Sequence, residues 1–264
     1  GYPPFSAGTL FAGGRPFYMN LVEENGFLPD FDAIPGDVAG EARILFLNNP
    51  HSPTGRSYPK EKLLEAVDFC VDNNVLLVSD ECYCDLYFSE PPLSVLEFEE
   101  AWENTLVLHS LSKRSNMTGY AVGFCASHNS DLIGLYDKIQ RKSIQGVANV
   151  VQDAAAAAYN DDKHVEDMRS RYSERLELLL PALGEIGCRP VRPEATFFVW
   201  VKVPAGQTPI SFSERLLLEH GVNCVPGNLI SQEFEGVNPG EEYVRFALVA
   251  STVKVREAVE RLTG

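Results

Sequence analysis

The stretch Ser110-Leu111-Ser112-Lys113 follows an apolar run at residues 105–108 (TLVL) and precedes a glycine-punctuated apolar run that includes Gly119 and Gly123. An apolar run of this length is typical of a buried strand, so the pattern places the Lys113 amine among hydroxyl groups at a strand end. An amine held there can form an imine with a carbonyl compound. A lone SxSK is more often an exposed lysine in a loop, so the neighbouring segments decide between these two interpretations.

Two earlier segments indicate the fold. Apolar runs at residues 42–47 and 75–78 have strand length and little polar alternation, which is typical of parallel strands buried on both faces. An amphipathic helix that starts at Pro59 is predicted between them. Strand, helix and strand in succession form the βαβ unit of a parallel sheet, so we predict an α/β fold. Catalytic groups of such sheets lie at the carboxyl ends of the strands, where Asp80 and Lys113 both fall.

The second half of the chain predicts two long helices and then a different kind of domain. Residues 130–158 and 163–186 have helical periodicity, and the segments after them alternate between strand and helix patterns. We therefore predict a large domain over residues 1–186 and a small C-terminal α+β domain over residues 187–264.

Composition excludes several classes of protein. The 264 residues are 45% hydrophobic and 22% charged, which is typical of a globular chain with a sizeable core. The net charge of −15 would repel a phosphate backbone, which argues against a nucleic-acid partner. No apolar run has the length of a membrane span, and the first residues lack the pattern of a secretion signal, so we expect a cytoplasmic protein without a membrane partner. The six cysteines are scattered, and no histidine lies at ligand spacing from them or from Asp80 and Glu81, so no metal site is predicted.

The order of Ser52-Pro53-Thr54-Gly55, Asp80-Glu81-Cys82-Tyr83 and Ser110 to Lys113 resembles the class I/II aminotransferases, which are pyridoxal phosphate enzymes of fold type I. The resemblance implies a large domain with a mainly parallel sheet, a homodimer, and amino-acid and 2-oxo-acid substrates. Residues 198–204 and 238–250 are most similar to succinyldiaminopimelate aminotransferases, which use N-succinyl-LL-diaminopimelate with 2-oxoglutarate. Gly1-Tyr2-Pro3 is similar to a segment that follows a longer N-terminal portion in the family, so we expect that portion, with its first phosphate loop, to be absent from these 264 residues.

The resemblance assigns roles to single residues. Lys113 would carry the cofactor as an imine and shuttle a proton, and Asp80 would keep the pyridine nitrogen protonated. The other implied cofactor contacts are Tyr83 to the 3′ oxygen, Ser110 and Ser112 to the phosphate, and Tyr2 stacked on the ring. Arg245, inside an apolar strand, would bind the α-carboxylate of the substrate through its planar fork.

Two positions depart from the family pattern. Ser52 stands where the family has an asparagine that contacts the 3′ oxygen and the substrate carboxylate, and Ala121 stands where it has a phosphate-binding arginine. Loss of a charged hydrogen bond costs about 1.5 to 3 kcal/mol and loss of a neutral one about 1 kcal/mol. The alternative hypothesis is therefore an aminotransferase-like fragment that does not bind the cofactor and serves as a binding or dimerisation module.

Overall fold

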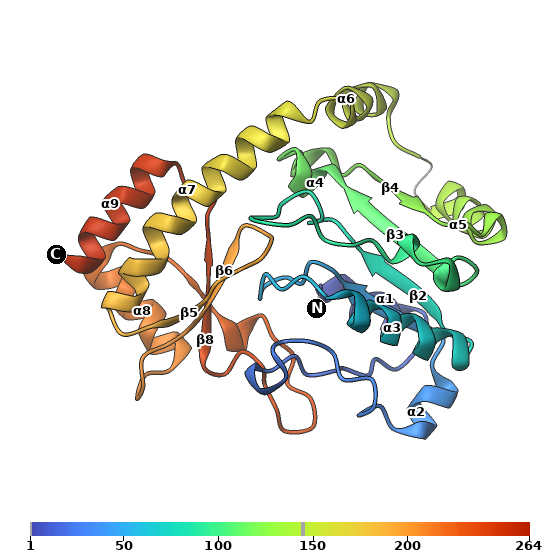
Figure 1. Cartoon of the computed structure of the whole chain (residues 1–264), viewed down its shortest axis with the longest axis horizontal. Coiled ribbons are helices and arrows are strands. Elements are labelled where there is room, and N and C mark those ends of the chain that lie inside the picture. The colour runs from blue at the N-terminus through green and yellow to red at the C-terminus, as the bar shows by residue number, and fades with distance from the viewer. Residues whose placement is uncertain (1, 144–145) are drawn as a thin grey trace.

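The computed structural model describes residues 2–143 and 146–264, and it folds these into two separate four-stranded sheets (Figure 1). The first sheet has the order β1 (Ile44–Asn48), β2 (Leu76–Asp80), β3 (Thr105–Ser110) and β4 (Gly123–Ala126). Strands β1 to β3 are parallel, and β4 is antiparallel to β3. This arrangement confirms the predicted α/β fold with a mainly parallel sheet.

The parallel part forms because its strands are apolar and a helix covers one face. Helix α3 (Lys60–Asp72) lies between β1 and β2 in the chain and buries Leu63, Ala66, Val67 and Cys70. The core that these residues share includes Leu47 of β1 and Leu77 of β2. The strand register pairs Asn48 with Asp80, and Asp80 with Leu108, so polar strand ends meet at one edge of the sheet.

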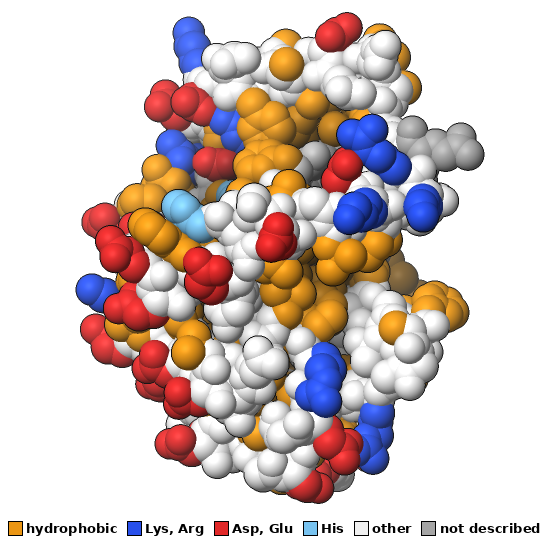
Figure 2. All heavy atoms as spheres, turned by 90° about the vertical axis from the view of Figure 1, so that its right-hand side faces the viewer, with side chains coloured by type: hydrophobic (Ala, Val, Ile, Leu, Met, Phe, Trp, Pro, Cys, Tyr) orange, Lys and Arg blue, Asp and Glu red, His pale blue; other side chains and the backbone are white. Residues whose placement is uncertain are grey.

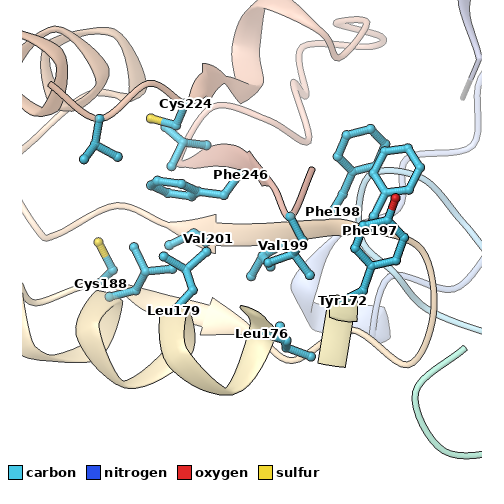
Figure 3. Packing of buried hydrophobic residues seen from close by; sticks show 14 of the residues in the cluster. Tyr172, Leu176, Leu179, Cys188, Phe197, Phe198, Val199, Val201, Cys224 and Phe246 are labelled. Carbon is cyan, nitrogen blue, oxygen red and sulfur yellow. The ribbon is translucent and has the colours of Figure 1, made fainter. Parts of the chain in front are cut away.

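The second sheet is antiparallel, with the order β5 (Arg189–Val191), β6 (Phe198–Lys202), β8 (Tyr243–Ala247) and β7 (Val225–Pro226). Helices α7 (Lys163–Glu185), α8 (Pro209–His220) and α9 (Thr252–Thr263) pack beside it. Figure 3 shows Leu176 and Leu179 of α7 facing Val199 and Val201 of β6 in this core. All four side chains are buried, so α7 is held firmly against the second sheet.

The remaining helices are short or surround the first sheet. They are α1 (Pro3–Phe11), α2 (Gly36–Glu41), α4 (Leu111–Arg114), α5 (Ser130–Ser143) and α6 (Asn149–Tyr159), together with single 3₁₀ turns at Glu23–Asn25, Val95–Glu97, Glu99–Ala101, Thr118–Tyr120 and Gly227–Leu229. Among the helices of the described part of the chain, none is long and apolar enough to cross a membrane.

The change from the first sheet to the second supports the proposed domain division near residue 186, which stays a prediction. Helix α7 ends at Glu185 and β5 begins at Arg189. An early segment nevertheless packs on the second sheet: Phe27 contacts Tyr243, and the carboxylate of Glu23 lies 2.9 Å from the Lys202 amine. The two units are therefore joined by N-terminal residues as well as by α7.

Candidate active site

The first part of the candidate site is the junction between β3 and α4. Strand β3 ends at Ser110, whose hydroxyl accepts a hydrogen bond of 3.1 Å from the backbone N–H of Ser112 and thereby caps α4. The same hydroxyl lies 3.5 Å from the carbonyl oxygen of Val122. The cap orients the four-residue helix at the carboxyl edge of the sheet and thereby fixes the backbone position of Lys113.

Lys113 is partly buried, and its amine lies over two aromatic faces. The Nζ atom is 5.9 Å from the ring centre of Tyr83 and 5.8 Å from that of Phe197, which comes from the loop that leads into β6. Within the residues that the structure describes, no carboxylate pairs with this amine and no hydrogen bond engages it. Lys113 therefore offers an amine that is held in place by aromatic contact and free of an acidic partner.

Asp80 is at the end of β2 and lines a pocket of about 380 Å³. Its carboxylate accepts a hydrogen bond of 3.1 Å from the backbone N–H of Cys82, and only 8% of the residue is exposed. Tyr2, Ser110 and Ala121 line the same pocket. The structure thus brings Tyr2, Asp80 and Ser110 together, with Tyr2 at 58% exposure on the rim. Ser112, Lys113, Tyr83, Ser52 and Arg245 do not line it.

A second group of predicted residues lies outside the lining of this pocket, around Tyr83. Arg245 of β8 is half-buried, and its guanidinium lies 4.2 Å above the ring of Phe198. Burial lowers the pKa of Arg245, and the described residues contain no carboxylate paired with it. Burial also raises the pKa of Tyr83, against a hydrogen bond from Ser52 and the charge of Arg245. Ser52, Tyr83 and Arg245 are therefore neighbours, and the unpaired guanidinium is suited to an anion.

The aromatic rings connect Lys113 with Arg245. The ring centres of Phe197 and Phe198 are 4.6 Å apart, and Tyr83 lies 5.7 Å from Phe197. The lysine amine lies over one end of this group and the arginine over the other. The amine of Lys113 and the guanidinium of Arg245 therefore lie over the same aromatic group.

These residues fit pyridoxal phosphate at its reactive end. Lys113 is an amine without a described carboxylate partner, Asp80 is a buried carboxylate, and Tyr83 is a phenol kept protonated by burial. The fit to the phosphate group of the cofactor is weaker, because the described lining of the pocket contains no lysine or arginine. Ala121, where the sequence resemblance expects an arginine, is exposed with a φ of 48°. Its methyl group cannot donate a hydrogen bond to a phosphate.

Sequence reasoning missed a cluster in the wall of the pocket, which His109 and Phe124 line. The ring of His109 stacks on Phe124 at 4.8 Å, its Nδ1 lies 3.5 Å from the thiol of Cys84, and its Nε2 lies 3.8 Å from the carboxylate of Glu81. Burial lowers the pKa of His109 and raises those of Cys84 and Glu81. The only sequence signal was that Glu81 and Cys84 surround Tyr83, because His109 comes from a different strand.

Comparison with known proteins adds family information to this geometry. The family described as aminotransferase class I and II matches residues 1–262. LL-diaminopimelate aminotransferases of Syntrophobacter fumaroxidans and Aquifex aeolicus are 39% and 38% identical over 263 residues, which is 99% of this chain and 66% of each relative. The chain therefore spans less than two thirds of the length of these curated relatives.

Solved structures of similar fold include aminotransferases. Substrate-bound BacF from Bacillus subtilis is 32% identical with a TM-score of 0.89, and the match covers 100% of this chain and 66% of that one. An aminotransferase from Neisseria meningitidis is 30% identical with a TM-score of 0.91, over 99% and 67% of the two chains.

Proposed function

The chain belongs to the class I and II aminotransferase family, and from this premise we propose that it serves pyridoxal phosphate-dependent transfer of an amino group between an amino acid and a 2-oxo acid. The observation that carries the proposal is the placement of the Lys113 amine over Tyr83 and Phe197, without an acidic partner among the described residues. A lysine whose role is structural would ordinarily pair with a carboxylate or extend into solvent.

Each group would have a separate task. When bound, pyridoxal phosphate supplies an electron sink for the carbon from which a proton is lost. Lys113 would move that proton, because its amine lies over the aromatic group without an acidic partner among the described residues. Asp80 would hold a proton on the ring nitrogen, and Arg245 would bind the substrate carboxylate with its two parallel N–H groups. Tyr83, through burial and its contact with Ser52, would donate a hydrogen bond to the 3′ oxygen.

We further propose a diamino acid of the diaminopimelate type as the amino donor. The support is that curated relatives with 39% and 38% identity carry the name LL-diaminopimelate aminotransferase. The succinylated form of this substrate, with 2-oxoglutarate, is the alternative that the sequence resemblance suggests. Half-reactions with LL-diaminopimelate, its N-succinyl derivative and glutamate separate these possibilities. A homodimer is also proposed from the family and is tested by light scattering.

The decisive experiment adds pyridoxal phosphate to the purified chain. We expect a visible absorbance band that borohydride reduction makes permanent, with the added mass located by peptide mass spectrometry at Lys113. The variant K113A should lose the band, whereas K254A, which removes an exposed lysine of α9, should keep it. Absence of the band at saturating cofactor would contradict the proposal and favour the alternative of a module that does not bind the cofactor.

A further inference from the structure

The three residues that follow Lys113 are anchored to the start of α7. The hydroxyl of Ser115 lies 2.9 Å from Nε2 of His164, whose Nδ1 lies 3.1 Å from the carboxylate of Asp161. The amide nitrogen of Asn116 lies 2.9 Å from the sulfur of Met168. These contacts join α4 to the first two turns of α7, which Figure 1 shows running from beside α4 to the second sheet.

Arg114 makes the most extensive contacts of the three. Only 7% of this residue is exposed. Its Nε lies 3.0 Å from the carboxylate of Asp85, one terminal nitrogen donates a 2.8 Å hydrogen bond to the carbonyl of Ala158, and the other pairs with the carboxylate of Asp162. Its guanidinium also lies 5.4 Å from the ring centre of Tyr159. One side chain therefore links the segment after β2, the end of α6 and the start of α7.

The two adjacent basic residues of α4 differ in their charged partners. Arg114 has two carboxylate partners, whereas Lys113, the preceding residue of the same short helix, has none among the described residues. The Lys113 amine lies over the ring of Tyr83, and the charge of Lys113 acts on the thiol of Cys82; burial raises the pKa of both groups, which keeps them neutral. The charge of Asp80 also acts on both groups. Both described carboxylates that pair with a residue of α4, Asp85 and Asp162, are therefore bound by Arg114.

We propose that Arg114 is a positioning residue for Lys113: it holds and neutralises Asp85 and Asp162, fixes α4 against α7, and thereby leaves the Lys113 amine without an acidic partner. This inference rests on the proposed function, since a free amine at residue 113 is what the amino-transfer chemistry needs. The planar guanidinium suits the task because it can bond two carboxylates and a carbonyl in different directions at once.

The test measures the Lys113 amine in the cofactor-free chain, so it does not depend on cofactor binding. Acetic anhydride labels neutral amines, and peptide mass spectrometry gives the labelling rate of Lys113 relative to exposed Lys254 across a pH series. In R114Q, a released carboxylate should pair with Lys113, so its pH profile should move to higher pH and its rate at a fixed pH should fall about tenfold. The double variant R114Q/D85N should recover most of the rate.

A matched control separates positioning from general loss of packing. Arg175 lies on α7, the helix to which Arg114 is anchored, and it donates a 2.8 Å hydrogen bond to the carbonyl of Leu248, just after β8. R175Q should lower the melting temperature to a similar degree and leave the Lys113 profile unchanged. R114K, whose three donors sit on one nitrogen and so cannot spread as widely as those of the guanidinium, should give an intermediate fall of about threefold.

The outcomes are distinct from those of the cofactor experiment. A wild-type Lys113 profile in whichever of R114Q and R114K folds would overturn the positioning role. Conversely, if the profile moves as expected but pyridoxal phosphate gives no band that borohydride makes permanent, the proposed function fails while the role of Arg114 in holding Lys113 stands.

Discussion

Replacement of Ala121 by arginine should tighten binding of pyridoxal phosphate. Ala121 lines the pocket next to Ser110, and this pocket has no lysine or arginine among its described lining residues. A charged hydrogen bond contributes about 1.5 to 3 kcal/mol, and the lower figure applies because residue 121 is exposed and its charge is screened by solvent. About 1.5 kcal/mol corresponds to a dissociation constant roughly tenfold lower. The left-handed backbone at this position, with φ of 48°, already carries a side chain, so a longer one adds little strain.

The assay is an equilibrium titration of the chain with pyridoxal phosphate, followed by absorbance and by equilibrium dialysis. Two control variants isolate the cause: A121Q adds length without charge, and Y120R adds the same charge at an exposed neighbour outside the pocket lining. Titration with pyridoxal, which lacks the phosphate, should give the same affinity in A121R and wild type. Equal affinities of A121R and A121Q for pyridoxal phosphate would refute the reasoning that the phosphate end lacks a cation.

Three further predictions concern stability and substrate binding. Burial lowers the pKa of His51 from 6.5 to about 3, so below pH 6.5 the unfolded chain gains a proton that the folded chain excludes. The contribution of His51 to the free energy of unfolding should therefore be full above pH 6.5 and fall by up to about 1.4 kcal/mol per pH unit down to pH 3. Denaturant unfolding of H51Q should lack this pH-dependent contribution. Equal dependence of the unfolding free energy on pH in both proteins would contradict the prediction. L176A removes a fully buried side chain from the core of the second sheet, so its free energy of unfolding should fall by about 3 kcal/mol. L217A, at a position that is 52% exposed, should change this free energy by less than about 0.5 kcal/mol. Similar losses in both variants would show that this core is misplaced. R245K keeps the charge but loses the planar fork, so the affinity for glutamate should fall about tenfold. The measurement is calorimetry on the cofactor-loaded chain. R192K, at a surface arginine, should leave the affinity unchanged.

The sequence alone determined the parallel part of the first sheet and the position of the lysine on it. The runs at residues 42–47, 75–78 and 105–108 could be identified because they are largely apolar and of strand length, which is typical of a parallel sheet. Burial on both faces was not confirmed for β1, which lies at the edge of the sheet with Ile44 exposed. Asp80 and Ser110 then had to lie at the same edge, since parallel strands end together. The types and order of Asp80, Tyr83 and Lys113 revealed the resemblance to the family, and the resemblance supplied their proposed roles.

Only the tertiary structure decided which side chains surround these groups. Phe197 and Phe198 come from the loop before β6 and from its first residue, yet they lie beneath Lys113 and Arg245. The partners of Arg114 include Asp162, which precedes α7 and lies almost fifty residues later in the chain. The packing of Phe27 on Tyr243 was likewise not visible in the sequence. Local periodicity reports which face of an element is buried, but it carries no information about which distant element covers that face. Contacts between such elements are set by how the whole core packs, so the electrostatic surroundings of Lys113 exist only in the folded chain.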